Sequence, residues 1–496
     1  MSEKEKSAKL TLKNTSLVGG AQLIRIIIQV IKTKFIAIFL GPAGIGLIQL
    51  FTSTLTLVQS ISGLGLGFSG VREIADGFGK KDEEKIAKSI GILQKWSFVA
   101  GFVGILLTTI FSKKLSVWTF GSEEYWIEIS ILSVVIILTN MSMSYSAVIQ
   151  GVRKMNLFAK INILGAFFGA IVAVIVYYFL REKGILPVMI LSAVIVLCIN
   201  VYYYRTLGYR RSNLSPKKVF FGGLSMVELG LFTVITGFIA QITLYYVRVS
   251  INTNLGTEYV GFYSVATEMA INYMGLVFAA MSADYFPKLS SINTDNKALN
   301  VAVIEQTKII LLLGCPLIII MYTFSEYVIQ ILYTSEFLAA LPLLMWLLLS
   351  VFLRLIAFPI GYVFLAKGKS RIFIFIETLW SSIFIGLTYI FWQFDIGLVG
   401  VGIAFTSAYV IYLCANIFLI KGITQFRYDK KTLVYITLFS VVTLIYFLSS
   451  IYNLDSWLIF GVKIIGVLIF GIYCLKELEK LVGINIVKLI INKFKK

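Results

Sequence analysis

The chain has 496 residues, of which 58% are hydrophobic and only 14% are charged, and its mean hydropathy is +0.89. This composition excludes an ordinary soluble domain and indicates a protein with many membrane spans, since one span needs roughly 20 consecutive apolar residues. The formal net charge of +19 would suit a nucleic-acid partner, but the positions of the charges argue against one.

Apolar stretches long enough to span a membrane recur along the whole chain. They predict an all-α polytopic membrane protein with about 14 transmembrane helices. The first span follows a charged leader and is longer than a signal peptide, so we expect it to stay in the mature protein. The predicted spans lie near residues 15–40, 43–70, 88–111, 125–150, 160–180, 185–204, 222–250, 258–283, 301–324, 338–365, 372–392, 398–420, 432–450 and 456–476.

Both termini are predicted to be cytoplasmic, because this topology places most of the 44 Lys and Arg residues on the inner side. The predicted outside loops hold only Lys113, Lys114, Arg181 and Lys183. Cytoplasmic loops of membrane proteins carry an excess of such cations. The basic excess is therefore explained first by topology and second by attraction to anionic membrane lipids, and we expect no nucleic-acid partner.

Two short turns recur at a fixed spacing in the sequence. The stretch LGPAGIGLIQLF (40–51) is echoed by LGTEYVGFYSVA (255–266). Gly41 aligns with Gly256 and Gly46 aligns with Gly261, both at an offset of 215 positions. The same offset aligns Lys154 in QGVRKM with Lys369 in LAKGKS. Two separate turns at one offset indicate an internal duplication.

The duplication predicts two six-helix bundles related by an axis along the membrane normal, with a cleft between them. The basic tail after the last span alternates charged and apolar residues, which suits a helix lying along the inner interface. The predicted organisation is an N-terminal bundle (1–205), a cytoplasmic linker (206–221), a C-terminal bundle (222–421), two additional transmembrane helices (422–476) and a basic cytoplasmic tail (477–496).

The first span, QLIRIIIQVIKTKFIAIFLGP (22–42), carries three cations inside an apolar segment. A charge at mid-membrane costs about 2.5–3.5 kcal/mol on insertion scales and usually faces a bundle interior or a wet cavity. Lys34 lies on another side of the helix, where its long stem can reach the interface. The remaining polar side chains fall within an arc of roughly 100° and predict a cavity wall: Gln22, Arg25, Gln29, Lys32 and Thr33.

A second polar stripe lies on the seventh predicted span, where Gln241, Tyr245, Arg248 and Asn252 fall within an arc of about 60°. Arg354 adds a cation near the middle of the tenth span. We predict that these cations converge on the cleft and bind an anion, since the guanidinium fork suits phosphate. The predicted anion-binding residues are Arg25, Lys32, Arg248 and Arg354, and the predicted cleft-lining polar residues are Gln22, Gln29, Gln241, Tyr245 and Asn252.

The alternative is that each cation pairs with a carboxylate inside the membrane. Glu268 and Glu377 are candidates for such pairing and also for coupling transport to an H⁺ or Na⁺ gradient. The other carboxylates available for pairing are Glu128, Glu228 and Glu305.

The sequence holds little that would support catalysis or a bound metal. Its four cysteines lie in predicted spans without CxxC spacing and it has no histidine, so we expect no metal site, disulfide framework or cofactor. The glycine string SGLGLGFSG (62–70) lacks the context of a nucleotide-binding loop and indicates close helix contact or bending. No Walker lysine motif or activated nucleophile is present, so we predict that the protein is not an enzyme.

The leader with its polar first span, the turn LGPAGIGL, the stretch SGLGLGFSGVREIAD and the turn QGVRKM resemble a known family. They are similar to the O-antigen and polysaccharide-unit translocases of the multidrug/oligosaccharidyl-lipid/polysaccharide exporter superfamily. The similarity is concentrated in residues 1–160, and the predicted number of spans exceeds the twelve common among O-antigen translocases.

The resemblance implies a flippase in the bacterial inner membrane that moves undecaprenyl-pyrophosphate-linked oligosaccharide outward by alternating access. It also implies a role in O-antigen, capsule or exopolysaccharide synthesis, with a polysaccharide polymerase and a chain-length regulator as partners. The last two spans resemble the appended pair of peptidoglycan lipid flippases, which suggests a groove for the lipid tail.

Three other functions stay open at this point. A multidrug or other lipid-precursor exporter of the same superfamily is one, although an exporter of cationic drugs is expected to carry acidic residues at its cleft, and the first span has none. A membrane-embedded glycosyltransferase or polymerase is another, although the predicted outside loops are short. The third is a structural partner in an assembly, which would work without the cleft cations.

Overall fold

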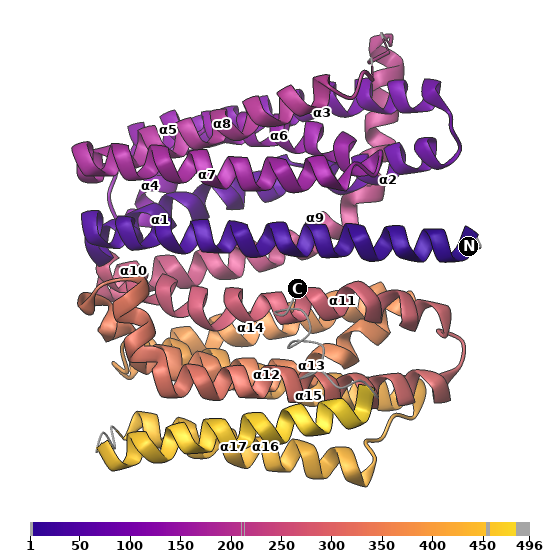
Figure 1. Cartoon of the computed structure of the whole chain (residues 1–496). Coiled ribbons are helices and arrows are strands. Elements are labelled where there is room, and N and C mark those ends of the chain that lie inside the picture. The colour runs from indigo at the N-terminus through magenta and orange to yellow at the C-terminus, as the bar shows by residue number, and fades with distance from the viewer. Residues whose placement is uncertain (1–2, 210, 213, 453–456, 483–496) are drawn as a thin grey trace, which may run out of the picture. The chain divides into compact units, whose positions relative to one another are not determined.

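The computed structural model describes residues 3–209, 211–212, 214–452 and 457–482, and these residues form helices and the turns between them (Figure 1). Short 3₁₀ segments cover Arg181–Gly184 and Ser335–Ala340, and a π-helical turn covers Glu268–Asn272. The α-helices are α1 (Glu3–Ser62), α2 (Leu66–Gly79), α3 (Glu83–Ile110), α4 (Ser112–Phe120), α5 (Trp126–Leu132), α6 (Val134–Gly151), α7 (Met155–Leu180), α8 (Ile185–Arg205), α9 (Pro216–Leu255), α10 (Thr257–Thr267), α11 (Tyr273–Ser291), α12 (Asn296–Leu332), α13 (Leu341–Ala366), α14 (Ser370–Gln393), α15 (Leu398–Thr424), α16 (Lys430–Ile451) and α17 (Trp457–Val482).

The helices group into two compact units. Unit 1 comprises the chain up to Gly261 together with Ile331–Glu336, and unit 2 comprises Phe262–Gln330 and the chain from Phe337 onward. Helix α9 follows the predicted linker but packs against α1, α2 and α3 and so belongs to unit 1. The contact boundary therefore lies later in the chain than residues 206–221, and the domain organisation derived from the duplication stays a prediction.

Helix α1 is interrupted at Gly41, whose φ of 63° and ψ of −169° are open essentially only to glycine. Pro42 follows and lacks the N–H that a continuous helix would need there. The equivalent position in the second copy of the repeat is Gly256, between α9 and α10, and it adopts the same type of conformation, with φ of 102° and ψ of 169°. The backbone thus repeats its break at the offset found in the sequence.

The two breaks also contact each other in a reciprocal way inside unit 1. A Cβ added to Gly46 would lie 2.0 Å from the carbonyl oxygen of Thr257, and a Cβ added to Gly261 would lie 2.1 Å from that of Pro42. Positions 42 and 257, like positions 46 and 261, are separated by the offset of the repeat. Each copy of the turn therefore packs its glycine on the other copy, which supports the predicted duplication.

A second pair of turns matches in equal detail. Arg153 and Gly368 both have positive φ, 57° and 68°, at the ends of α6 and α13. The next N–H groups, of Lys154 and Lys369, donate to carbonyl oxygens five positions earlier at 3.1 Å and 2.8 Å. The equivalent hydrogen bonds show that the aligned lysines of the sequence repeat begin α7 and α14 with the same local geometry.

Eleven helical stretches in the described part of the chain are long and apolar enough to cross a membrane, and a twelfth is added if the bent pair Thr257–Ala279 and Asp284–Ser291 forms one span. The first of them is broken at Gly41, and Met155–Arg205 is interrupted by the 3₁₀ segment Arg181–Gly184. The larger number of spans expected from the sequence and the cytoplasmic position of both termini stay predictions.

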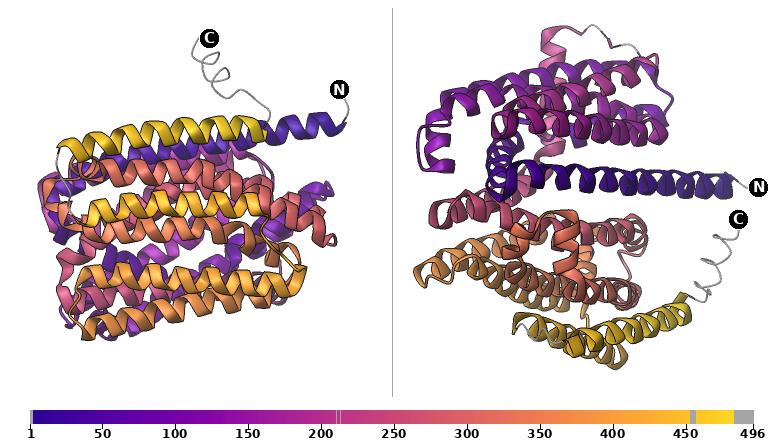
Figure 2. Two further views of the ribbon diagram at one scale, coloured as in Figure 1. Left: turned by 90° about the horizontal axis from the view of Figure 1, so that it is seen from below. Right: turned by 60° about the vertical axis from the view of Figure 1, so that its left-hand side comes forward.

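Helices α16 and α17 run side by side within unit 2 (Figure 2). The Phe439 and Phe470 rings meet edge to face at 5.0 Å, and the Tyr446 hydroxyl donates to the Lys463 carbonyl at 2.8 Å. Asp429 caps α16 by accepting the N–H of Thr432, as the preference for Asp at this position leads one to expect. The first six residues of the predicted basic tail (477–496) continue α17 to Val482, and the rest of the tail lies outside the described residues.

Candidate functional site

The predicted stripe on α1 lies on a helix that packs mainly along α7 (Figure 1). Arg25 and Gln29 are exposed, and Gln22 and Lys32 are half-buried. The stripe is therefore not absorbed into the core of unit 1. Arg248 lies half-buried on α9, which contacts α1, whereas Arg354 lies on α13 in unit 2. The convergence of all four cations on one cleft stays a prediction.

Lys34 was expected to extend toward the interface, and the structure gives it a specific partner. Its Nζ donates a hydrogen bond to the carbonyl oxygen of Tyr333, in the short segment of unit 1 that follows α12. Tyr333 is fully buried. Lys34 thus acts as a structural contact, distinct from the stripe that holds Lys32.

Two of the predicted cleft-lining residues of α9 take part in a buried hydrogen-bond chain. The Tyr245 and Thr119 hydroxyls lie 2.7 Å apart, and Thr119 in turn lies 3.1 Å from Thr54 of α1. Asn252 donates to the Thr119 carbonyl at 3.1 Å and accepts from the Thr257 hydroxyl at 2.8 Å. These contacts join α1, α4 and α9, so Tyr245 and Asn252 have a structural role within unit 1.

Gln241, one turn earlier on α9, instead lines a pocket of about 370 Å³ with both polar and apolar walls, here called the unit 1 pocket. Its walls come from α1, α2, α3, α6 and α9. Among the residues that the structure describes, no charged side chain lines it. The polar part of the lining consists of Thr56, Gln59, Ser60, Ser97, Asn140, Thr233 and Gln241. The apolar part consists of Leu66, Phe68, Met143 and Val234, beside glycines.

Asn140 is the most buried amide of this pocket, at 5% exposure. Its Oδ1 receives a long 3.5 Å hydrogen bond from Nε2 of Gln59, and its own Nδ2 has no partner among the described residues. Leaving a buried donor unpaired costs about 1–3 kcal/mol. Asn140 lines the pocket, and an unpaired buried donor beside a pocket is a group that an ordered water or a ligand satisfies once it reaches the atom.

Glycines bring the backbone close around the unit 1 pocket. A Cβ on Gly65, which has φ of +68°, would lie 2.8 Å from the Gly230 carbonyl oxygen, so α2 begins in backbone contact with α9. This confirms that the glycine string permits close helix contact, and it ends α1 at Ser62, earlier than the predicted span. By contrast, a Cβ on Gly237 would meet nothing within 4 Å, because this residue faces the open pocket.

Unit 2 places Arg354 and Glu377 in one neighbourhood, here called the unit 2 charge cluster. The charge of Arg354 acts on the Glu377 carboxyl, and the Tyr412 hydroxyl donates to Oε1 of Glu377 at 2.9 Å. The guanidinium also lies 4.8 Å from the centre of the Phe278 ring, a cation–π distance. Arg354 therefore has a carboxylate in its neighbourhood, as the alternative requires, but no ion pair within 4 Å joins these two described side chains.

Glu268, the other coupling candidate, opens the π-helical turn Glu268–Asn272. Its Oε2 accepts a 2.5 Å hydrogen bond from Nδ2 of Asn272. Single π-helical turns inside α-helices frequently occur at functional sites. Glu305, which was a candidate partner for the cleft cations, pairs with Lys288 at 3.2 Å instead.

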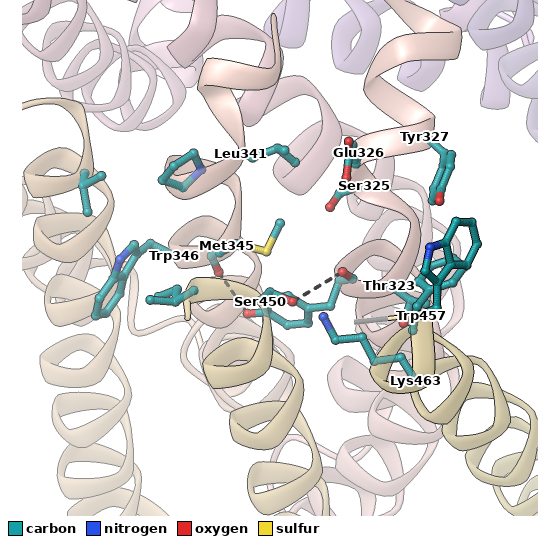
Figure 3. Close-up of a pocket in the computed structure, with 15 residues that line it drawn as sticks. Thr323, Ser325, Glu326, Tyr327, Leu341, Met345, Trp346, Ser450, Trp457 and Lys463 are labelled. Carbon is teal, nitrogen blue, oxygen red and sulfur yellow. Dashed lines mark hydrogen bonds between the residues drawn. The ribbon is translucent and has the colours of Figure 1, made fainter. Parts of the chain in front are cut away.

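A larger pocket of about 530 Å³ lies within unit 2, between α16–α17 and the ends of α12 and α13 (Figure 3). Tyr322, Trp346 and Trp457 contribute aromatic walls, and Glu326 and Lys463 contribute charged groups. The charged part of this lining does not match a hydrocarbon chain. The lipid-tail groove hypothesised for the last two helices stays a prediction, and the predicted anion-binding residues lie elsewhere.

Residues 35–342, more than half of the chain, match the family described as polysaccharide biosynthesis protein. The chain belongs to this family. The membership predicted from the N-terminal motifs is confirmed, because the match covers the turn LGPAGIGL, the glycine string and the turn QGVRKM.

Two curated relatives of this polysaccharide biosynthesis protein have transport names. The lipid III flippase of Escherichia coli (strain K12) is 22% identical over 83% of this chain and 99% of its own length. The putative O-antigen transporter of Shigella flexneri is 25% identical over 78% of this chain and 91% of its own length.

Solved structures similar to this polysaccharide biosynthesis protein establish the fold. An inward-facing multidrug resistance MATE family transporter of the MOP superfamily matches with a TM-score of 0.68 at 15% identity, over 82% of this chain and 94% of the other. A MOP superfamily transporter from Pyrococcus furiosus matches with a TM-score of 0.57 at 16% identity, over 84% and 96%. The predicted all-α, multi-span membrane fold is confirmed at this level.

Sequence reasoning missed Gln59 and Asn140 as site residues. Gln59 shares one face of α1 with Thr52 and Thr56, and Asn140 shares one face of α6 with Ser144. Hydroxyl groups that bond to carbonyls of their own helix are ordinary in an apolar segment, so these faces did not stand out as polar stripes. The sequence does place Asn140 near the middle of the apolar Trp126–Gly151 stretch. An amide at such a position is costly without a partner, and this could have marked it as a candidate.

Proposed function

We propose that this protein is a flippase that moves undecaprenyl-pyrophosphate-linked oligosaccharide from the inner to the outer leaflet of the bacterial inner membrane. The transport names of the relatives support it. The observation that carries the proposal is that unit 1 combines membrane cations on α1 with an uncharged, partly polar pocket. This combination suits an amphiphile that has an anionic linker and a polar head.

The chemistry of such a cargo matches the two features separately. The pyrophosphate is attracted to Arg25, Lys32 and Arg248, because charge pairing is strong where water is scarce. The oligosaccharide head needs hydrogen-bonding groups inside the membrane, while the polyprenyl tail stays in lipid. Alternating access of the two halves then releases the cargo outward. Arg354, which has Glu377 in its neighbourhood, contributes less to the cargo path in this proposal than the cations of unit 1.

Energy coupling falls to the membrane carboxylates in this proposal. Glu377 accepts a hydrogen bond from Tyr412 and feels the charge of Arg354, and Glu268 lies at a π-helical turn. In this proposal one of the two residues exchanges H⁺ or Na⁺ during the cycle. No other cofactor is part of the proposal, and the cargo is moved without a bond being made or broken.

The expected surroundings of the flippase are membrane lipids, the lipid-linked oligosaccharide and the enzymes that extend it. A polysaccharide polymerase and a chain-length regulator are proposed as partners because they act on the product of flipping. O-antigen, capsule and exopolysaccharide pathways all supply a cargo of this class.

Transport of a fluorescent undecaprenyl-pyrophosphate oligosaccharide in proteoliposomes tests the proposal. The parent is compared with Arg25→Ala and Arg248→Ala, and Lys113→Ala on the predicted outside loop serves as the control cation. We expect flipping by the parent and the control and its loss in the two span variants. A parent that inserts correctly and flips nothing contradicts the proposed function, and unchanged flipping in both span variants contradicts the role of the cations.

The same assay separates the competing functions. A multidrug exporter would move a cationic dye and leave the lipid-linked cargo in place. A glycosyltransferase or polymerase would change the length of the saccharide, which chromatography of the recovered lipid detects.

A further inference from the structure

Three residues that line the unit 1 pocket lie near the middle of apolar helical stretches long enough to cross a membrane. Ser97 is close to the midpoint of Glu83–Ile110, Asn140 to that of Trp126–Gly151, and Gly237 to that of Pro216–Leu255. Polar groups near the middle of a span are expensive unless they serve a ligand or a wet cavity, and transporter sites lie near the midplane for this reason.

The hydroxyl groups of the pocket present acceptors. Thr56, Ser60 and Thr233 each donate to a carbonyl oxygen of their own helix, at 2.9, 2.6 and 2.6 Å. Their protons are therefore used, while the oxygen lone pairs stay available. A ligand group that donates hydrogen bonds finds several partners along α1 and α9.

The amide groups of the pocket present donors as well as acceptors. Nδ2 of Asn140 is buried and has no partner within the described chain, and Gln241 makes no hydrogen bond to any described residue. An amide offers two N–H donors and a carbonyl acceptor. A ligand rich in hydroxyl groups, each of which donates and accepts, satisfies both sets at once.

We infer that the unit 1 pocket binds the uncharged saccharide head of the cargo through the Asn140 and Gln241 amides, apart from the cations that attract the pyrophosphate. This inference rests on the proposed function. It assigns recognition of the saccharide to the unit 1 pocket and attraction of the pyrophosphate to the membrane cations. A hydrocarbon tail would leave the amides unpaired, and an isolated ion would find no charge in the lining. Hydroxyl groups are the class that matches the groups present.

Two substitutions test the pocket from different directions. Asn140→Leu keeps the branched shape of the side chain and removes the orphaned donor, so thermal stability is expected to stay equal or to rise. Gly237→Leu fills the pocket from a position where the added side chain meets open space. The matched control is Gly386→Leu on α14, another helical glycine with nothing within 4 Å of an added Cβ and outside the pockets described above.

The experiment measures the affinity of the purified full chain in nanodiscs for two probes. One is undecaprenyl diphosphate, and the other is undecaprenyl diphosphate bearing a trisaccharide of N-acetylglucosamine. We expect the parent and Gly386→Leu to bind the saccharide-bearing probe about 10-fold or more tightly than the bare lipid, as one or two neutral hydrogen bonds allow. Asn140→Leu and Gly237→Leu are expected to lose this preference and to keep the affinity for the bare lipid.

The outcomes separate this inference from the proposed function. A parent that binds neither probe contradicts the flippase proposal itself. A parent that binds both probes equally, variants that keep the preference, or variants that lose both probes alike overturn the saccharide pocket while leaving the flippase proposal in place.

Discussion

Gly46 lies so close to the carbonyl oxygen of Thr257 that an added Cβ would stand 2.0 Å from it. Gly261 has the reciprocal relationship with Pro42, at 2.1 Å. The two copies of the motif can therefore pack this closely only because both positions lack a side chain.

Replacing either glycine by alanine should lower the stability of unit 1. Because the neighbour is backbone and cannot rotate away, Gly46→Ala and Gly261→Ala are each expected to cost about 2–3 kcal/mol or more. Gly237→Ala on α9 is the control, since its added methyl group meets open space and alanine favours a helix by up to about 1 kcal/mol. Thermal unfolding in detergent measures all three, and a Gly46→Ala protein as stable as the control contradicts the packing.

Lys32 and Lys34 should differ in what their loss affects. Lys34→Met removes the donor to the buried Tyr333 carbonyl and is expected to cost about 1–3 kcal/mol of stability. The folded fraction should still flip cargo. Lys32→Met is expected to spare stability and reduce flipping. Melting curves beside the proteoliposome assay check both, and a reversal of the two phenotypes would assign the cargo contact to Lys34.

Arg354 and Glu377 should be energetically coupled. Removing one of two interacting charges that are partly withdrawn from water leaves the other less well compensated. Arg354→Leu with Glu377→Gln should therefore be destabilised by less than the sum of the single variants, with a coupling of at least about 1 kcal/mol. A double-mutant cycle of melting temperatures provides the measurement. Strict additivity together with lost transport would instead return Arg354 to the cargo path.

The cap of α16 should make stability depend on pH at the acid end. Burial alone raises the pKa of Asp429, but hydrogen bonds from Thr432 and Lys308 outweigh it and hold the pKa below the usual carboxyl value. A lowered pKa in the folded state means that the stabilisation is complete above the unfolded pKa and is lost as the pH falls through the folded one. Its removal by Asp429→Ala should cost about 1 kcal/mol at neutral pH.

The comparison of melting temperatures at pH 7 and pH 3 checks this expectation. The gap between the parent and Asp429→Ala should narrow in acid, and Asp429→Asn, which keeps a neutral cap, should fall between them at pH 7. An equal gap at both pH values would mean that the charge of Asp429 does not contribute.

The sequence alone could predict the features that depend on local composition or on a regular spacing of residues along the chain. Span length follows from hydropathy, and the constant offset of the repeat marks Gly41 and Gly256, where the backbone indeed breaks alike. Family membership followed from contiguous motifs. These signals are local or periodic, so no knowledge of neighbouring helices was needed to read them.

Features that depend on which side chains of another helix lie opposite a residue were harder to predict. Gln241 and Tyr245 share one arc of α9, yet Gln241 lines the unit 1 pocket while Tyr245 meets Thr119. A helical wheel specifies the face of a side chain but not what lies opposite it at each depth. Asn140 shows the same limit, because the pocket around it is assembled from five helices, of which only α9 carries a predicted stripe residue at the wall.

The uncharged lining of the unit 1 pocket has a further consequence for a cell. A membrane potential acts on charge, at about 2.3 kcal/mol per elementary charge per 100 mV. Amides, hydroxyls and a neutral saccharide carry none, so their binding is electrically silent. A fall in voltage would slow the turnover of a coupled flippase, yet the choice among saccharides made at Asn140 and Gln241 would be the same in a resting and in an energised membrane.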